Sequence, residues 1–266
     1  MRKLILLTGI IAVLIASCNN QSNTRKRTTS KKTAQTFNEV LDYQMKDILM
    51  KDTTCTNSDI LKCTHVRLAY PEFLGTHAGT ANMLTRDLIT YLLYDKDLGT
   101  SRSNDLKKVT DDFLLNYYKL KRSFPDLKQT WYFRLNSRPL YEQDSVLCFA
   151  FDYDTYTGGA HGLRGRYFLN LNRYTGKKLW PLSLVKDMDA FSQLAEKKFR
   201  EIKGIKPGES LNDAGFKFEN NQFRLPANIG LSDKGFILRY NLYEIAPYAL
   251  GPTEFTISYR EAGIKK

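Results

Sequence analysis

The residue pattern that could carry chemistry lies in a glycine-rich segment near the middle of the chain. Glycine enters positive-φ backbone conformations at no steric cost, so two adjacent glycines after an extended run indicate a tight loop. A plain turn would need neither the histidine nor the tyrosine that accompany these glycines. The segment is therefore a candidate binding loop, formed by Tyr156, Gly158, Gly159, His161 and Gly162.

His161 allows two interpretations. As a catalytic residue it would be a general base, oriented by Asp152 or Asp154 from the end of the preceding strand. As a structural residue it would close the loop by hydrogen bonds while the glycines set the backbone path. The second interpretation is preferred, because the sequence has no nucleophile elbow, His-Glu-x-x-His motif, phosphate-binding loop or dinucleotide fingerprint. We assign no catalytic residue and do not expect an enzyme.

Metal and cofactor chemistry find little support in the sequence. The three histidines, His65, His77 and His161, are scattered along the chain and do not have the spacing of zinc ligands. We therefore predict no metal and no cofactor.

A second candidate site lies in the segment Tyr243-Glu244-Ile245-Ala246-Pro247-Tyr248. Glu244, Tyr243 and Tyr248 could present a polar and aromatic face to a sugar or a protein. Alternatively, the two tyrosines pack internally and Glu244 accepts hydrogen bonds from backbone donors, which is the preferred interpretation.

The first 18 residues are typical of a bacterial lipoprotein signal peptide. Arg2 and Lys3 precede an apolar run of about 13 residues, shorter than the roughly 20 that span a bilayer. The run ends in Ile-Ala-Ser-Cys, so we expect lipidation at Cys18 and a chain held outside the cytoplasm. The periplasmic and surface faces are not distinguished, and an uncleaved anchor helix is the alternative.

Residues 19–36 are rich in basic and polar residues and contain no acid, so they predict a disordered basic tether. Of the net charge of +12, residues 37–266 keep 33 basic and 28 acidic residues, a net charge of +5. Outside the cytoplasm such a tether could lie against anionic lipid or wall polymer, but the preferred interpretation is that it merely stays soluble, and we expect no nucleic-acid partner.

The remaining cysteines have different predicted roles. Cys55 and Cys63 flank a short polar segment in a compartment that permits oxidation, so we predict a disulfide between them. Cys148 lies inside an apolar strand and is predicted to be a buried free thiol.

The hydrophobic periodicity predicts an α+β fold of antiparallel sheets with a few packed helices, in two similar-sized halves, residues 37–126 and 127–266. In the first half we expect a strand within 37–51, a strand over 64–70 that Pro71 ends, and two helices. The first helix would run from 77 to 94, and the second would be capped by Ser103 or Asn104 and stop before Pro125. The predicted apolar residues of the first helix are Met83, Leu84, Leu88, Tyr91 and Leu92. Those predicted to be buried in the second helix are Leu106, Val109, Phe113, Tyr117 and Leu120.

In the second half the period changes to two. We expect a strand through Trp131, Phe133 and Leu135, a central strand over 145–154, a third over 167–172 and a turn with Gly176. A helix is predicted near 187–203, with a stripe of Met188, Phe191, Leu194, Phe199 and Ile202. Four extended runs follow, over 216–218, 222–225, 236–241 and 253–259.

Several of these segments resemble a known family. The loop Tyr156-Thr157-Gly158-Gly159-Ala160-His161-Gly162, the turn Thr175-Gly176-Lys177 and the segment from Tyr240 to Gly251 are similar to the RsiV-type domain of unknown function. Tyr70-Pro71-Glu72-Phe73 before a helix is similar to the N-terminal region shared by RsiV and the peptidoglycan deacetylase PdaC. The resemblance spans roughly residues 37–262, and it implies the PdaC/RsiV-type region in 37–126 and the RsiV-like domain in 127–266.

The resemblance implies a binding role. RsiV-like anti-sigma factors bind lysozyme through this region, and in PdaC-like proteins it precedes a separate catalytic domain that is missing from this sequence. A run of acids, Glu142, Asp144, Asp152 and Asp154, could attract a basic hydrolase such as lysozyme.

We therefore expect a lipid-anchored module that binds a cell-envelope protein or peptidoglycan glycan. A wall-modifying hydrolase that uses His161 and a purely structural lipoprotein are the alternatives.

Overall fold

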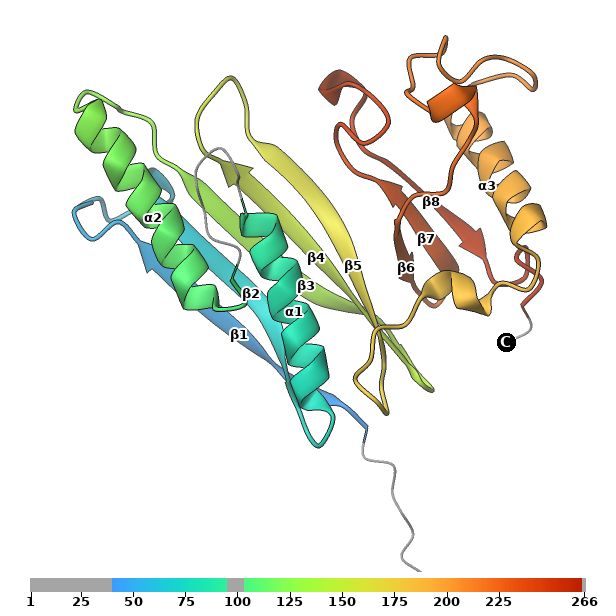
Figure 1. The fold of residues 1–266 in the computed structure, drawn as a ribbon, viewed down its shortest axis with the longest axis horizontal. Coiled ribbons are helices and arrows are strands. Elements are labelled where there is room, and N and C mark those ends of the chain that lie inside the picture. The colour runs from blue at the N-terminus through green and yellow to red at the C-terminus, as the bar shows by residue number, and fades with distance from the viewer. Residues whose placement is uncertain (1–39, 95–102, 265–266) are drawn as a thin grey trace, which may run out of the picture. The chain divides into compact units, whose positions relative to one another are not determined.

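A computed structural model describes residues 40–94 and 103–264. Within these ranges the chain is mixed α+β, with eight strands in two mostly antiparallel sheets and three α-helices (Figure 1). The expected signal peptide, the expected tether and the predicted lipidation site Cys18 lie outside the described residues. No described helix has the length and apolar character needed to cross a membrane.

The first sheet is the larger of the two, and its strands lie in chain order. They are β1 (Asp42–Lys51), β2 (His65–Leu74), β3 (Tyr132–Gln143), β4 (Val146–Tyr156) and β5 (Leu163–Asn172). Neighbours are antiparallel except β2 and β3, which are parallel and pair across the expected boundary between residues 126 and 127. The connection between these two strands contains the helices α1 (Ala78–Leu93) and α2 (Leu106–Ser123).

The strand expected in residues 37–51 is confirmed as β1, but the predicted end of β2 is wrong. Pro71 lies inside β2, opposite Met45 of β1. Parallel pairing of β2 with β3 extends only from His65 to Ala69. Beyond that point one side of β2 has no strand partner, so a residue without an N–H group fits there.

Helices α1 and α2 cover one face of the first sheet (Figure 1). The core between them is apolar and fully buried, and it includes Leu68, Ile89, Val109, Phe133 and Phe149. Asp105 caps α2 in place of the predicted Ser103 or Asn104. Its Oδ1 atom accepts hydrogen bonds from the backbone N–H groups of Lys107 and Lys108.

The second sheet contains β6 (Asn228–Leu231), β7 (Gly235–Tyr240) and β8 (Thr253–Ser258), and α3 (Met188–Lys203) packs with it. Its core also includes Cys148 of β4. Side chains alternate along a strand, so β4 is buried on both faces, with Phe149 toward the helices and Cys148 toward the second sheet. The thiol is free, as predicted, and burial raises its pKa to about 12.

Two of the predicted extended runs are wrong. Residues 216–218 and 222–225 form no strand, and a short 3₁₀ turn separates them. Their apolar side chains are buried because Phe216, Phe218 and Phe223 surround Phe199 of α3. The missed strand, β6, is only four residues long, too short for an alternating pattern to show.

The predicted helix faces also need correction. On α3 the buried line is Phe191, Ala195 and Phe199, whereas Met188 and Ile202 are 39% and 55% exposed. On α1 the buried residues are Ala81, Thr85, Ile89, Thr90 and Leu93. Met83 and Tyr91, predicted to be buried, are 44% and 63% exposed. Leu84, Leu88 and Leu92 are half-buried and pack at the edge of the core, so the predicted apolar stripe of α1 is a second face that packs only in part.

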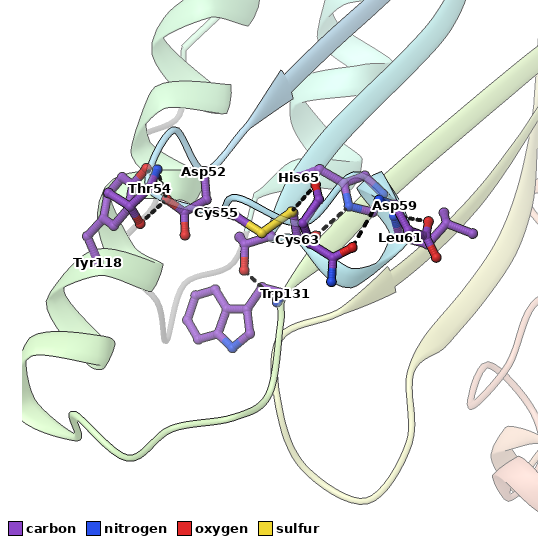
Figure 2. The surroundings of a disulfide bond; sticks show 11 residues. Asp52, Thr54, Cys55, Asp59, Leu61, Cys63, His65, Tyr118 and Trp131 are labelled. Carbon is purple, nitrogen blue, oxygen red and sulfur yellow. Dashed lines mark hydrogen bonds between the residues drawn. A yellow bond between two sulfur atoms is a disulfide. The ribbon is translucent and has the colours of Figure 1, made fainter.

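The predicted disulfide between Cys55 and Cys63 is present in the β1–β2 connection (Figure 2). Asp52 organises the start of this connection, because its Oδ1 atom accepts hydrogen bonds from the N–H and hydroxyl groups of Thr54 and from the hydroxyl of Tyr118. The disulfide and these hydrogen bonds fix the loop that leads into β2.

The close approach of the two sheets gives a stability test. A Cβ atom added at Gly230 of β6 would lie 2.6 Å from the ring of Phe168 on β5. Gly230→Ala is therefore expected to destabilise the fold by about 1–3 kcal/mol through overpacking. The control, Gly79→Ala, adds a Cβ atom to α1 with nothing within 4 Å, and should raise stability by up to about 1 kcal/mol. Chemical denaturation measures both, and equal effects would show that the approach of the sheets does not constrain residue 230.

Candidate functional site

The glycine loop joins the end of β4 to the start of β5, and its backbone has the predicted conformation. Gly158 and Gly159 have φ values of 110° and 87°, which favour glycine. Gly162 is needed for a different reason, because a Cβ atom there would lie 2.8 Å from the carbonyl oxygen of Thr155. The hydroxyl of Tyr156 donates a hydrogen bond to the carbonyl oxygen of Gly159 at 2.9 Å. The loop is thus closed on the strand that precedes it.

The structure brings the two candidate sites of the sequence together. The ring of His161 stacks on that of Tyr248 at a centroid distance of 4.0 Å, and its Nε2 atom lies 3.3 Å from the hydroxyl of Tyr243. Tyr243 has a φ of 65°, which turns the chain sharply at this point, and its side chain is 56% exposed. We call His161, Tyr243 and Tyr248 the aromatic platform.

The carboxylates proposed to orient His161 have other partners. Arg166 donates hydrogen bonds to Asp152, and Arg134 lies 3.7 Å from Asp154. Among the described residues, the His161 ring makes polar contacts with the carbonyl oxygen of Gly162 and the hydroxyl of Tyr243. The geometry does not form the histidine–aspartate pair that general-base catalysis would need.

The four acids that are close in sequence do not form one acidic patch. Asp144 lies in the turn between β3 and β4, whereas Asp154 lies near the other end of β4. Ten residues of strand separate the two by about 30 Å. The hydroxyl of Tyr43 also donates a hydrogen bond to Glu142, at 2.7 Å. The charge argument for a basic partner therefore loses its local basis.

Two asparagines that sequence reasoning missed hold the outer edge of β5. The Asn241 side chain accepts a hydrogen bond from the N–H of Arg166 at 3.0 Å and donates one to its carbonyl oxygen at 2.9 Å. Asn228 accepts from the N–H of Phe168 at 3.0 Å and also donates to the carbonyl of Arg166, at 2.7 Å. These side-chain amides bind the backbone groups of β5 that a sixth strand would otherwise pair with. The second sheet is therefore joined to the first through side chains.

Glu244 supports this junction. Its Oε2 atom accepts a hydrogen bond from the backbone N–H of Asn241 at 2.8 Å, as the preferred interpretation of the sequence expected. Part of the side chain is exposed, but neighbouring protein atoms exclude water from the carboxylate and raise its pKa. The hydrogen bond from Asn241 and the charge of Arg239 partly offset this shift.

A groove of about 1220 Å³ runs along this junction. The aromatic groove, as we call it, has α1 on one side and the glycine loop with the second sheet on the other. Leu84, Leu88 and Tyr91 line it, so the second apolar face of α1 faces a surface groove. Tyr91 and Trp180 are each 63% exposed. The groove also contains Tyr156, Tyr167, His161 and the carboxylates of Asp87 and Glu244.

Three of the candidate binding residues named from the sequence, Tyr156, His161 and Glu244, line this groove, whereas Tyr91 and Trp180 were not among the candidates. A weak signal for Tyr91 was its place at the edge of an apolar stripe wider than one packing face. In the ranges that the structure describes, no three metal-ligating side chains gather into a cluster that could hold an ion.

Comparisons with known proteins identify two regions. Residues 182–260 match the family model DUF3298, described as a protein of unknown function. Residues 56–164 match the family model described as deacetylase PdaC, which extends across β3 and β4. The expected resemblance to PdaC and to a domain of unknown function is thus confirmed, whereas the relation to RsiV and the bounds of the two regions stay predictions.

Two crystal structures of DUF3298 proteins share the fold. The one from Bacteroides fragilis has a TM-score of 0.57 and 19% identity, over 83% of this chain and 91% of that chain. The one from Pseudomonas aeruginosa has a TM-score of 0.58 and 18% identity, over 85% of this chain and 94% of that chain. At these identities the likeness concerns the fold alone. Among curated proteins, no significant match was found.

Asn241 provides a test of the junction between the sheets. Asn241→Ala removes the acceptor of the Arg166 N–H group and one of the two donors to its carbonyl oxygen, so it is expected to destabilise the fold by about 1–3 kcal/mol. The exposed Asn104, replaced by Ala, should change stability by less than about 0.5 kcal/mol. Denaturation by urea measures both. Similar small effects would mean that water replaces the side chain at the β5 edge.

Glu244 predicts a pH-dependent stability. A carboxyl group whose pKa is raised in the folded state stabilises the fold in its protonated form. This contribution to the free energy of unfolding is complete below the ordinary carboxyl pKa and is lost as the pH rises through the raised pKa. The free energy of unfolding of Glu244→Gln should therefore exceed that of the wild type at neutral pH, and the gain should shrink in acid. Glu201→Gln, at an exposed position of α3, controls for the loss of one charge. A gain that is constant with pH would contradict the assignment.

Proposed function

We propose that the protein is a lipid-anchored, extracytoplasmic module that binds a cell-envelope glycan in the aromatic groove. The observation that carries the proposal is the groove itself, where exposed aromatic rings and carboxylates line one continuous surface. Tyrosine and tryptophan combine an apolar ring with a polar tip, so they contact both the C–H faces and the hydroxyls of a sugar. Asp87 and Glu244 supply acceptors for sugar hydroxyls.

The size and form of the groove favour an extended ligand. Its volume of about 1220 Å³ lies above the roughly 300–1,000 Å³ of pockets for small molecules. The groove is also held from both sides, by α1 and by the asparagine-capped junction at β5. A glycan chain could therefore lie along it without a large rearrangement of the backbone.

The expected anchor fits this role. A signal peptide that ends at Cys18 and a tether over residues 19–36 would hold the module near the membrane and within reach of wall polymer. The resemblance to the region that accompanies the peptidoglycan deacetylase PdaC points to the same class of ligand.

A protein ligand is the second candidate, because the aromatic platform exposes Tyr243 at 56% and the nearby Leu250 at 48%. Exposed aromatic side chains are enriched at protein interfaces. Lysozyme remains one such partner. A hydrolase that uses His161 and a purely structural lipoprotein remain the alternatives of other classes.

The test is a binding titration of the purified protein with soluble peptidoglycan fragments. Tyr91→Ala and Trp180→Ala are each expected to weaken binding about 5- to 30-fold, because each removes an exposed ring from the groove. Phe124→Ala is the matched control: this ring is 61% exposed but is not among the groove residues. Thermal unfolding of each variant confirms that the fold is retained.

The outcomes separate the candidates. Loss of binding in the two groove variants alone supports glycan recognition in the groove. If wild type and variants bind the fragments equally, the proposal is wrong. Binding to lysozyme that Tyr243→Ala abolishes would favour the protein ligand, and release of shorter fragments would favour the hydrolase.

A further inference from the structure

The face of the first sheet opposite α1 and α2 carries charged side chains in register at one end. Arg67, Arg134, Asp154 and Arg164 face one another across β2, β3, β4 and β5. Side chains opposite each other on neighbouring strands lie about 5 Å apart. This row therefore places three guanidinium groups and one carboxylate in a line across the sheet.

A second hollow, of about 690 Å³, lies over this row, and Arg239 of β7 also lines it. We call it the arginine pocket. Of the residues that line it, Tyr153 alone also lines the aromatic groove. Its charged lining residues include Arg67, Arg134, Arg164, Arg239, Asp152 and Asp154.

Most carboxylates near the pocket are already paired. Asp47 lies 2.8 Å from Arg67, Arg166 holds Asp152 through two nitrogens, and Arg239 lies 2.8 Å from Glu254. Arg134 is 3.7 Å from Asp154, beyond hydrogen-bond distance. Arg164 forms no ion pair with any of the described residues. Arg134 and Arg164 therefore keep donors that face the pocket unused.

Arg134 is held in place by its neighbours. Its guanidinium lies 4.0 Å from the centre of the Tyr132 ring, and its Nε–H donates to Nε2 of His65 at 3.1 Å. His65 is buried, and its Nδ1 lies 2.8 Å from the carbonyl oxygen of Cys63, one of the disulfide cysteines (Figure 2). The backbone carbonyl requires N–H at Nδ1, so Nε2 is the acceptor. The ring is thus fixed in the tautomer that orients Arg134.

We propose that the arginine pocket binds a phosphate group, with Arg134 and Arg164 as its ligands. A guanidinium that is already oriented can present two parallel N–H donors to a phosphate, which a mobile lysine cannot do. Burial lowers the pKa of His65, which keeps its Nε2 lone pair available to hold Arg134. The phosphate could belong to a soluble molecule or to a lipid headgroup, since both offer the same oxygens.

Calorimetric titration of the full chain with pyrophosphate tests the site. Arg164→Gln and Arg134→Gln are each expected to lower the affinity about tenfold or more. Arg224→Gln removes an arginine from an exposed pair with Glu219 and should change nothing. Arg134→Lys keeps the charge but loses the Nε–H that His65 accepts, so it should lose most of the affinity that Arg134→Gln loses.

Each result bears on the proposal. Equal losses in Arg164→Gln and Arg224→Gln would show unspecific charge attraction and overturn the site. Full affinity in Arg134→Lys would overturn the positioning role of His65. Co-sedimentation with phosphatidylcholine vesicles, with and without phosphatidylglycerol, identifies the source. A loss of phosphatidylglycerol binding in Arg164→Gln indicates a lipid headgroup, and unchanged vesicle binding with lost pyrophosphate binding indicates a soluble ligand.

Discussion

The structure depends on how the outer edge of β5 is satisfied. An unpaired strand edge attracts other chains, and its buried polar groups are costly without partners. Here the side chains of Asn228 and Asn241 supply those partners from the second sheet. The same contacts fix where the chain continues after Asn241, so Tyr243 and Tyr248 reach His161 in the glycine loop. A structural requirement at one strand edge thus determines the position of the candidate site.

The two faces of β4 contribute to the two hollows for which we propose ligands. The side chains of β4 that point toward the helices pack beneath α1 and the aromatic groove. On the other face, Cys148 lies in the second core, and Asp154 lines the arginine pocket. The middle of β4 is buried on both faces, and the end of the same strand lines both hollows. Tyr156, at the end of β4, closes the glycine loop and stacks on the ring of Tyr132. The guanidinium of Arg134 packs against that same Tyr132 ring.

The sequence predicted the features that depend on local chemistry. The α+β class, the disulfide, the buried Cys148 and the positive φ angles of Gly158 and Gly159 follow from composition, spacing and backbone sterics. It could not predict features that depend on packing between distant segments. Pro71 is tolerated because β3 stops pairing there, Phe216 is buried without a strand, and Tyr91 faces a groove. Hydrophobic periodicity predicts which side chains lie on one apolar face. It does not predict which part of the protein, if any, packs against that face.

The contrast between the two hollows has a physical cause. In the aromatic groove, rings and leucines offer binding energy through apolar area, so affinity there should depend little on salt. In the arginine pocket, binding would come from guanidinium groups, and it should weaken as salt screens the charges. A ligand that reaches both would need an apolar face and a phosphate group. Tyr156 of the aromatic groove stacks on Tyr132, whose ring packs against the guanidinium of Arg134, and Tyr153 lines both hollows, so this end of β4 connects the two.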